Sequence, residues 1–222
     1  MQPNALTVQE VVEKAFSTVL REKIAVTGAG RTDTGVHASF FIFHFDSQDH
    51  EIDTEKLVYR LNGYLPPDIA LQRIWKVPDD AHARFSALSR TYKYFIHSKK
   101  DPFKTDTSYF YVGTLDVDKM NTGAGLLKDY RDFTSFSRLH TDVKTNLCRI
   151  IHAHWENEDD NLIFTIEADR FLRNMVRAIT GTLLQIGRGM LSVEEFRGII
   201  EAGDRSVAGD SAPARGLFLS EI

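Results

Sequence analysis

Gly28-Ala29-Gly30-Arg31-Thr32-Asp33-Thr34-Gly35-Val36-His37-Ala38 is the stretch that says most about the fold of this 222-residue chain. Its glycines permit positive φ angles and let the backbone approach a ligand closely, because they carry no Cβ. Among them stand one carboxylate, Asp33, and one guanidinium, Arg31. A strand-like aromatic run follows from Ser39 to Phe45. A loop that presents charged groups beside a sheet is a common place for catalysis.

Spacing excludes two nucleotide-binding motifs for this loop. A dinucleotide fingerprint requires a glycine three residues after Gly30, where the chain has Asp33. A P-loop requires Gly-Lys-Ser/Thr, but Gly35 is followed by Val36. With these motifs excluded, a tight turn with solvated charges is the ordinary interpretation of the loop. Only matches elsewhere in the chain can favour a functional interpretation over this one.

The composition indicates an ordinary globular protein, with 42% hydrophobic and 26% charged residues. No apolar run approaches the roughly 18 residues of a membrane span. The first ten residues lack the basic and apolar regions of a signal peptide. A single cysteine, Cys148, cannot form an internal disulfide and suits a reducing compartment. We therefore expect a cytoplasmic protein that has no membrane contact.

The net charge of −4 argues against a surface that is positive all over. Arg170, Arg173 and Arg177 nevertheless recur at i, i+3 and i+7, which would place them on one face of a predicted helix over 170–186. A solvated helix face is the ordinary interpretation of such a stripe. The functional interpretation is contact with phosphates, and RNA affinity would then depend strongly on salt.

Hydrophobic periodicity predicts an α+β chain in which helices alternate with strands. Thr7 and Glu10 form a capping-box pattern at the first helix. The predicted helices cover 8–20, 53–65, 115–130, 170–186 and 193–202. The predicted strands cover 23–27, 39–45, 69–77, 91–98, 146–155, 162–168 and 217–219. Pro78-Asp79-Asp80 marks a boundary between an N-terminal half, 1–80, that carries the glycine loop and a C-terminal half, 81–222.

The glycine loop resembles the Gly-Arg-Thr-Asp-x-Gly-Val-His signature of the tRNA pseudouridine synthase A family. Further blocks match that family in the same order, from about Thr7 to the C-terminus. These blocks are His82-Ala83-Arg84-Phe85-Ser86-Ala87, Arg90-Thr91-Tyr92-Lys93-Tyr94, Asp132-Phe133-Thr134-Ser135-Phe136, Phe171-Leu172-Arg173-Asn174-Met175-Val176-Arg177 and Gly216-Leu217-Phe218-Leu219.

The resemblance implies two ferredoxin-like (RNP-like) halves that share one extended, mostly antiparallel sheet with a central RNA-binding cleft. It also implies an isomerase that converts uridine to pseudouridine at positions 38 to 40 of the tRNA anticodon stem-loop. The implied enzyme is a homodimer that needs no cofactor and no metal. The alternative is a non-catalytic RNA-binding ferredoxin-like protein, which gives no reason for Asp33 in the loop.

The resemblance also implies three catalytic residues. Asp33 is the candidate nucleophile, although covalent attack and a glycal-type pathway both need this carboxylate. Arg177 matches the arginine that pairs with the aspartate. Tyr92 matches a tyrosine that stacks on the extruded uracil, and its hydroxyl is a candidate base for the C5 proton.

Four further residues are candidates for substrate binding. The resemblance assigns Arg31 to displacing the target base, which must leave its stack before it can react. His82 and Arg84 are expected to line the cleft and bind phosphate, with structural hydrogen bonding as an equal alternative. Arg173 belongs to the arginine stripe and is expected to contact RNA.

Two other features carry expectations of their own. His152 and His154 would face the same side of a strand, but no cysteine pair or His-Glu-x-x-His pattern joins them, so we expect solvated side chains and no metal site. Family members normally begin with a strand ahead of the helix at Thr7. This chain opens with Met1-Gln2-Pro3-Asn4, so we expect that strand to be missing, the first half to be less stable and the activity to be in question. The alternatives are a misassigned start codon and a strand that is supplied elsewhere.

Overall fold

The computed structural model describes residues 6–48, 51–138 and 145–222. The contacts divide the chain into two compact units, each with its own hydrophobic core. The first unit comprises Met1–Gly30 and Ile42–Ala87, and the second comprises Arg31–Phe41 and Leu88–Ile222. The residues of the glycine loop from Arg31 onward therefore pack with the second unit. The expectation that no strand precedes Thr7 concerns residues 1–5, which lie outside the described ranges.

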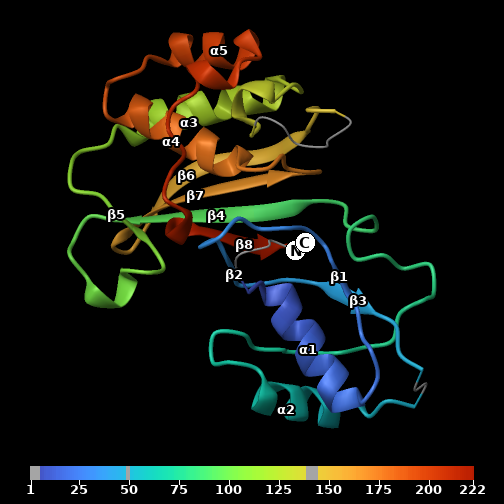
Figure 1. The fold of residues 1–222 in the computed structure, drawn as a ribbon. Coiled ribbons are helices and arrows are strands. Elements are labelled where there is room, and N and C mark those ends of the chain that lie inside the picture. The colour runs from blue at the N-terminus through green and yellow to red at the C-terminus, as the bar shows by residue number, and fades with distance from the viewer. Residues whose placement is uncertain (1–5, 49–50, 139–144) are drawn as a thin grey trace. The chain divides into compact units, whose positions relative to one another are not determined.

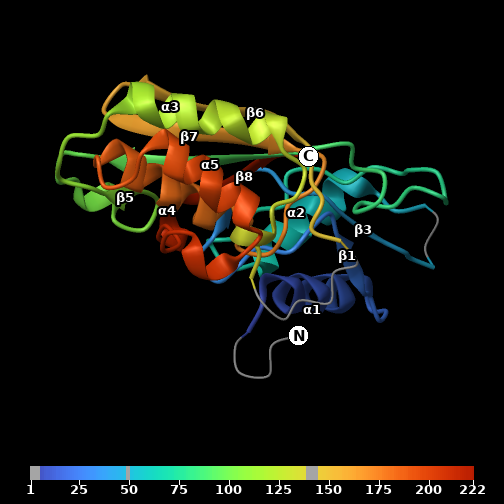
Figure 2. The ribbon, with the colours of Figure 1, turned by 90° about the horizontal axis from the view of Figure 1, so that it is seen from above.

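The second unit is an α/β layer with a mixed sheet of six strands. Its long strands are antiparallel in the order β8-β4-β7-β6, while β2 joins β8 and β5 joins β4 in parallel. Figure 1 shows α3, α4 and α5 on one face of this sheet, and Figure 2 shows α3 running along β6. The strands are β2 (His37–Ala38), β4 (Arg90–His97), β5 (Tyr109–Phe110), β6 (Ile150–Glu158), β7 (Asn161–Ala168) and β8 (Leu217–Glu221). The helices are α3 (Val117–Leu126), α4 (Met175–Gly187) and α5 (Val193–Ala202), with 3-10 turns η1 (Pro102–Lys104), η2 (Leu127–Asp129), η3 (Thr134–Phe136), η4 (Arg205–Val207) and η5 (Ala214–Gly216).

The core of the second unit lies between these helices and the sheet. Tyr94 and Ile96 are buried in it, and Tyr92 packs partly buried against it, so the predicted common face of β4 is confirmed. Trp155 of β6 stacks on Phe164 of β7, with ring centroids 4.7 Å apart. The predicted hairpin between these two strands is also confirmed.

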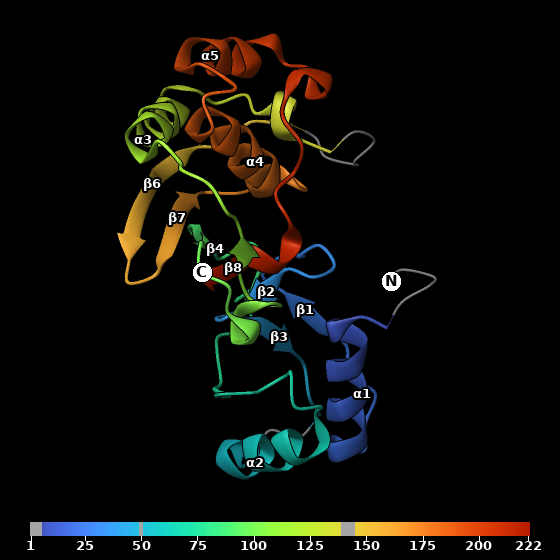
Figure 3. The same cartoon turned by 90° about the vertical axis from the view of Figure 1, so that its left-hand side faces the viewer.

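The first unit contains α1 (Val8–Leu20), α2 (Thr54–Tyr64) and an antiparallel pair of strands, β1 (Val26–Gly28) and β3 (Phe43–Phe45). Figure 3 shows this pair, α1 and α2. The Thr7–Glu10 capping box is present at the start of α1, as predicted. Phe16 of α1 packs edge-to-face on Phe43 and Phe45 and anchors a small core.

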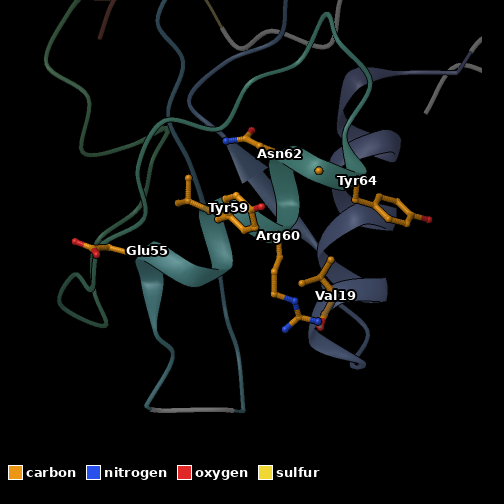
Figure 4. A pocket seen from close by; sticks show the side chains of 8 residues that line it. Val19, Glu55, Tyr59, Arg60, Asn62 and Tyr64 are labelled. Carbon is orange, nitrogen blue, oxygen red and sulfur yellow. The ribbon is translucent and has the colours of Figure 1, made fainter.

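A shallow hollow of about 760 Å³ lies along α2 (Figure 4). Its lining comes from α2 and from Val19 of α1, and it includes the exposed ring of Tyr59. None of the residues that the sequence proposed for the site lines this hollow. Its lining residues are Val19, Glu55, Val58, Tyr59, Arg60, Asn62, Gly63 and Tyr64.

The strand predicted over 69–77 is absent, because this part of the described chain has no strand partner. Ile69, Leu71 and Ile74 still pack against the small core. The backbone of Leu71 pairs with a side chain instead. Its N–H donates to Asn62 Oδ1 and its carbonyl accepts from Asn62 Nδ2, each at 2.7 Å. An alternation of apolar residues can therefore direct side chains into a core even where the backbone forms no hydrogen bonds with a neighbouring strand.

The helix predicted from 170 begins only at Met175. Asn174 at its N-cap has φ 66° in the left-handed region, which ends any helical path from the preceding residues. Arg170 and Arg173 therefore precede α4, and the prediction of three arginines on one helical face is wrong. The run predicted as one strand over 39–45 is likewise divided, with β2 before it and β3 at its end.

Near the middle of the edge strand β6, a helix side chain forms hydrogen bonds with the backbone groups of one residue. Asn121 of α3 donates from Nδ2 to the Trp155 carbonyl at 2.9 Å and accepts from the Trp155 N–H at 2.7 Å. In the first unit, the backbone of Val26 on β1 is paired in a similar way by Gln9 and Glu13 of α1. Within the described ranges, no helix is both long and apolar enough to cross a membrane.

Candidate active site

Asp33 opens a tight turn that is anchored on the large sheet. The Val36 N–H donates to the Asp33 carbonyl at 3.1 Å, and Gly35 between them has φ 78°. A positive φ at this third position is that of a type II turn and favours glycine. Gly28 and Gly30 do not use this freedom. The chain then enters β2, which pairs with β8.

The carboxylate of Asp33 lies between two guanidinium groups. Arg177 Nη1 is 3.6 Å from Asp33 Oδ2, and Arg173 Nε is 3.6 Å from Asp33 Oδ1. The side chains of Asp33 and Arg177 are each 22% exposed, whereas that of Arg173 is 48% exposed. Both pairs are ionic contacts longer than ordinary hydrogen bonds. The predicted partnership of Asp33 with Arg177 is present, and Arg173 joins it.

Tyr92 lies beside this ion cluster on β4. Its ring packs edge-to-face on Phe171, with centroids 5.2 Å apart. Burial raises the pKa of Tyr92 to about 12, and the negative charge of Asp33 acts in the same direction. The phenol therefore stays protonated near neutral pH and can donate a hydrogen bond.

Comparison with known proteins identifies the family. A family model described as tRNA pseudouridine synthase matches residues 1–86 and 130–222. The chain belongs to this family. The tRNA pseudouridine synthase A of Bacteroides thetaiotaomicron is 55% identical over 225 residues, which span all of this chain and 83% of that protein. The synthases A of Bacteroides fragilis and Bacillus subtilis are 53% and 40% identical, again over the whole chain and over 88% and 91% of their own lengths.

As a member of the tRNA pseudouridine synthase family, the protein is an isomerase that acts on uridine in tRNA. The geometry brings together Asp33, Tyr92, Arg173 and Arg177, all within the second unit. Tyr92 falls outside the two ranges that the family model matches, so its position beside Asp33 is the structure's own contribution.

The other proposed site residues of this synthase are placed differently. Arg31 is exposed, and its side chain makes no hydrogen bond or ion pair with the residues that the structure describes. His82 and Arg84 belong to the first unit. His82 Nδ1 accepts from the Arg84 and Phe85 N–H groups at 3.2 and 3.3 Å, so this ring stabilises a local turn. The Arg84 guanidinium lies 5.8 Å from the centre of the Phe85 ring.

The histidine pair of β6 is solvent-exposed, with ring centroids of His152 and His154 6.2 Å apart. In the part of the chain that the structure describes, no three metal-ligating side chains form a cluster.

Sequence reasoning missed the backbone that holds Arg177 in this family member. Arg177 Nε donates to the Ala212 carbonyl at 2.8 Å. No motif reveals a carbonyl acceptor 35 residues away, because every residue carries one. Gly181, isolated in the middle of α4, was the available signal. A glycine inside a helix often marks a close approach of another segment.

Proposed function

We propose that Asp33 is the catalytic carboxylate of a uridine-to-pseudouridine isomerisation at positions 38 to 40 of the tRNA anticodon stem-loop. The observation that carries this proposal is the place of Asp33 between the guanidinium groups of Arg173 and Arg177, near the phenol of Tyr92. A carboxylate held between two cations on a fixed turn is suited to act on the sugar or the base.

The reaction exchanges one glycosidic bond for another. The N1–C1′ bond breaks, the uracil turns, and a C5–C1′ bond forms. C5 loses a proton and N1 gains one, so the isomerisation balances without an oxidant or an energy source. Asp33 could form a covalent adduct or support a glycal-type intermediate, and the same carboxylate serves both pathways.

Tyr92 is assigned to the detached uracil. An aromatic face is a usual support for an unstacked RNA base. Because the pKa of Tyr92 is about 12, its hydroxyl is a better hydrogen-bond donor than base near neutral pH. Removal of the C5 proton by Tyr92 would require that pKa to fall when RNA binds. The base role therefore stays a prediction, with stacking and donation as the roles that the environment favours.

The remaining cations are assigned to RNA. Arg31 stands two residues before Asp33 with an exposed side chain, which suits a group that displaces the target base. Arg173 is half exposed and can face a phosphate while it contacts Asp33. Phosphate binding by His82 and Arg84 stays a prediction from the resemblance.

We also propose two ferredoxin-like halves, 1–80 and 81–222. Apart from the additional strand β5 and helix α5, the elements of the second half follow the succession β4-α3-β6-β7-α4-β8. This is the β-α-β-β-α-β order of that fold and supports the proposal for the second half. One sheet shared by both halves and a central RNA-binding cleft stay predictions. A homodimer and a cytoplasmic location are proposed on the family resemblance, and the buried free thiol of Cys148 suits the latter.

Release of tritium from tRNA labelled at uridine C5 tests the function directly. The wild-type protein should release label from positions 38 to 40 only, mapped with transcripts in which each of these uridines is replaced. Asp33→Asn should abolish release while tRNA binding stays within about threefold, because the amide keeps the shape and loses the charge. Turnover of more than a few per cent in the variant would contradict the assignment of Asp33.

Asp118→Asn is the matched control, since Asp118 is an exposed aspartate on α3 far in sequence from the loop. Its activity should equal that of the wild type. If the wild-type protein binds tRNA and releases no label, the alternative of a non-catalytic RNA-binding protein replaces the proposal.

A further inference from the structure

The side chain of Arg177 is held by hydrogen bonds to a loop that packs against α4. Ala212 and Arg177 share two hydrogen bonds: the Ala212 N–H donates to the Arg177 carbonyl at 2.9 Å, and Arg177 Nε donates to the Ala212 carbonyl at 2.8 Å. Ala212 is buried. With Nε held in this way, Nη1 is the guanidinium nitrogen that reaches Asp33.

The same loop runs directly over the next turns of α4. A Cβ on Gly181 would lie 1.8 Å from the Asp210 carbonyl oxygen, a separation that no side chain can adopt. One residue further along the helix, the Thr182 hydroxyl accepts from the Gly209 N–H at 3.1 Å in a buried position. The backbone of 209–212 is therefore seated against α4 at the missing side chain of Gly181.

Ser211 ties this loop to its surroundings. Its hydroxyl accepts from Asn174 Nδ2 at 2.7 Å and from Arg205 Nη2 at 3.3 Å. Arg205 also donates from Nη1 to the carbonyls of Ala208 and Gly209 at 3.3 and 3.4 Å. We call residues 205–212 the clamp segment.

We infer that the clamp segment sets the position of Arg177 for catalysis, with Ser211 and Arg205 as its positioning residues. The inference rests on the proposed function of Asp33. Arg205 is a cation close to the site, but its guanidinium is occupied by the loop's own carbonyls and by Ser211. We therefore assign Arg205 to holding the loop, and through the loop Arg177, and not to binding phosphate.

Placement matters here because the ion pair is long. At 3.6 Å from Asp33, the Arg177 guanidinium makes no short hydrogen bond that would fix its direction. Its orientation must come from the Nε bond to Ala212. A catalytic group displaced by about 1 Å can lose on the order of a hundredfold in rate, so a support of this kind has a measurable effect.

Ser211→Ala tests the inference, since it removes the acceptor that Asn174 and Arg205 share. We expect kcat to fall by about tenfold under single-turnover conditions while KM for tRNA changes by less than about twofold. Ser211→Thr keeps the hydroxyl and should recover most of kcat. In protein labelled with ¹⁵N-arginine, the Arg177 Nε–H signal, assigned by its loss in Arg177→Lys, should exchange faster with solvent in Ser211→Ala.

Ser17→Ala is the matched control, because Ser17 is a partly buried serine of the first unit whose hydroxyl accepts from the Ile24 N–H at 2.9 Å. It should lower stability by a similar amount and leave kcat and the Arg177 signal unchanged. A Ser211→Ala enzyme with wild-type kcat would overturn the inference, and so would a fall in kcat with unchanged exchange at Arg177. If Asp33→Asn is itself active, the proposed function fails first; if only the Ser211 result fails, the role of Asp33 stands.

Discussion

Two tyrosines on β4, separated by one residue, show how the surroundings of a side chain decide its use. The Tyr94 hydroxyl is inaccessible to solvent and donates to the Pro213 carbonyl at 2.9 Å. Burial raises the pKa of Tyr94 as well. The Tyr92 hydroxyl makes no hydrogen bond within the described ranges, and the negative charge of Asp33 acts on it. Tyr94 is therefore structural, while Tyr92 keeps a hydroxyl that substrate can engage.

Substitution of each tyrosine by phenylalanine should separate these two uses. Tyr92→Phe keeps the ring and should lower kcat by about tenfold or more with little change in KM, since stacking survives and hydrogen bonding is lost. Because the pKa of Tyr92 is about 12, ionisation of this group should cause no loss of wild-type activity until the pH approaches that value. Single-turnover rates across the pH range provide the measurement.

Tyr94→Phe serves as the comparison. It removes the shorter of the two hydrogen bonds to the Pro213 carbonyl, at 2.9 Å from the Tyr94 hydroxyl, and leaves only the one from the Gly216 N–H at 3.5 Å. It should lower the free energy of unfolding by about 1–2 kcal/mol, with a smaller effect on kcat than Tyr92→Phe. Equal kcat values for Tyr92→Phe and the wild type would restrict Tyr92 to stacking.

Among the elements, those set by local signals were predictable from the sequence. The capping box at Thr7 and the alternation of β4 both appear as expected, because each depends on residues a few positions apart. The start of α4 and the strand over 69–77 were predicted wrongly. The first depends on the left-handed conformation of Asn174, and the second on a pairing partner that periodicity does not report.

The candidate site divides in the same way. Asp33 and Arg177 were accessible through motifs, and their proximity in the structure agrees with that reading. Arg173 was expected only to contact RNA, yet in the structure it also contacts Asp33. The Ala212 carbonyl was beyond reach, because a backbone acceptor has no sequence signature.

Two helix glycines should respond to alanine with opposite signs. Alanine is favoured over glycine in a helix interior by about 1 kcal/mol. At Gly198 of α5 a Cβ would meet nothing within 4 Å, so Gly198→Ala should stabilise the protein by about 0.5–1 kcal/mol. At Gly181 the Asp210 carbonyl stands in the way, so Gly181→Ala should destabilise it by about 1–3 kcal/mol despite the helix preference.

Urea unfolding measures both free energies. The Gly181→Ala enzyme should also lose turnover, because the displaced backbone is the one that holds Arg177. A Gly181→Ala variant as stable as Gly198→Ala would show that the loop moves aside without cost.

At the scale of the whole molecule, the two units differ in the size of their cores. Twenty-seven buried residues form the described core of the second unit, and eight form that of the first. Stability grows with the apolar area that a core removes from water. The first unit should therefore open more readily, independently of how its residues serve the reaction.

Native-state hydrogen exchange can measure this difference. Amides of α1, β1 and β3 should exchange through openings of lower free energy than those of β4, β7 and α4. Equal protection in both sets of elements, over a range of low urea concentrations, would mean that the units open together and that core size does not govern their stability.

The hydrogen bonds that Asn121 of α3 makes to the edge strand β6 have a consequence for aggregation. An unpaired edge strand is a template on which another chain can add a strand and begin a fibril. At Trp155 both backbone groups are already bonded to Asn121. An incoming strand would have to break these two bonds and lift α3 before it could extend the sheet. The residue that fastens a helix to the edge thus also hinders the growth of amyloid-like stacks from it.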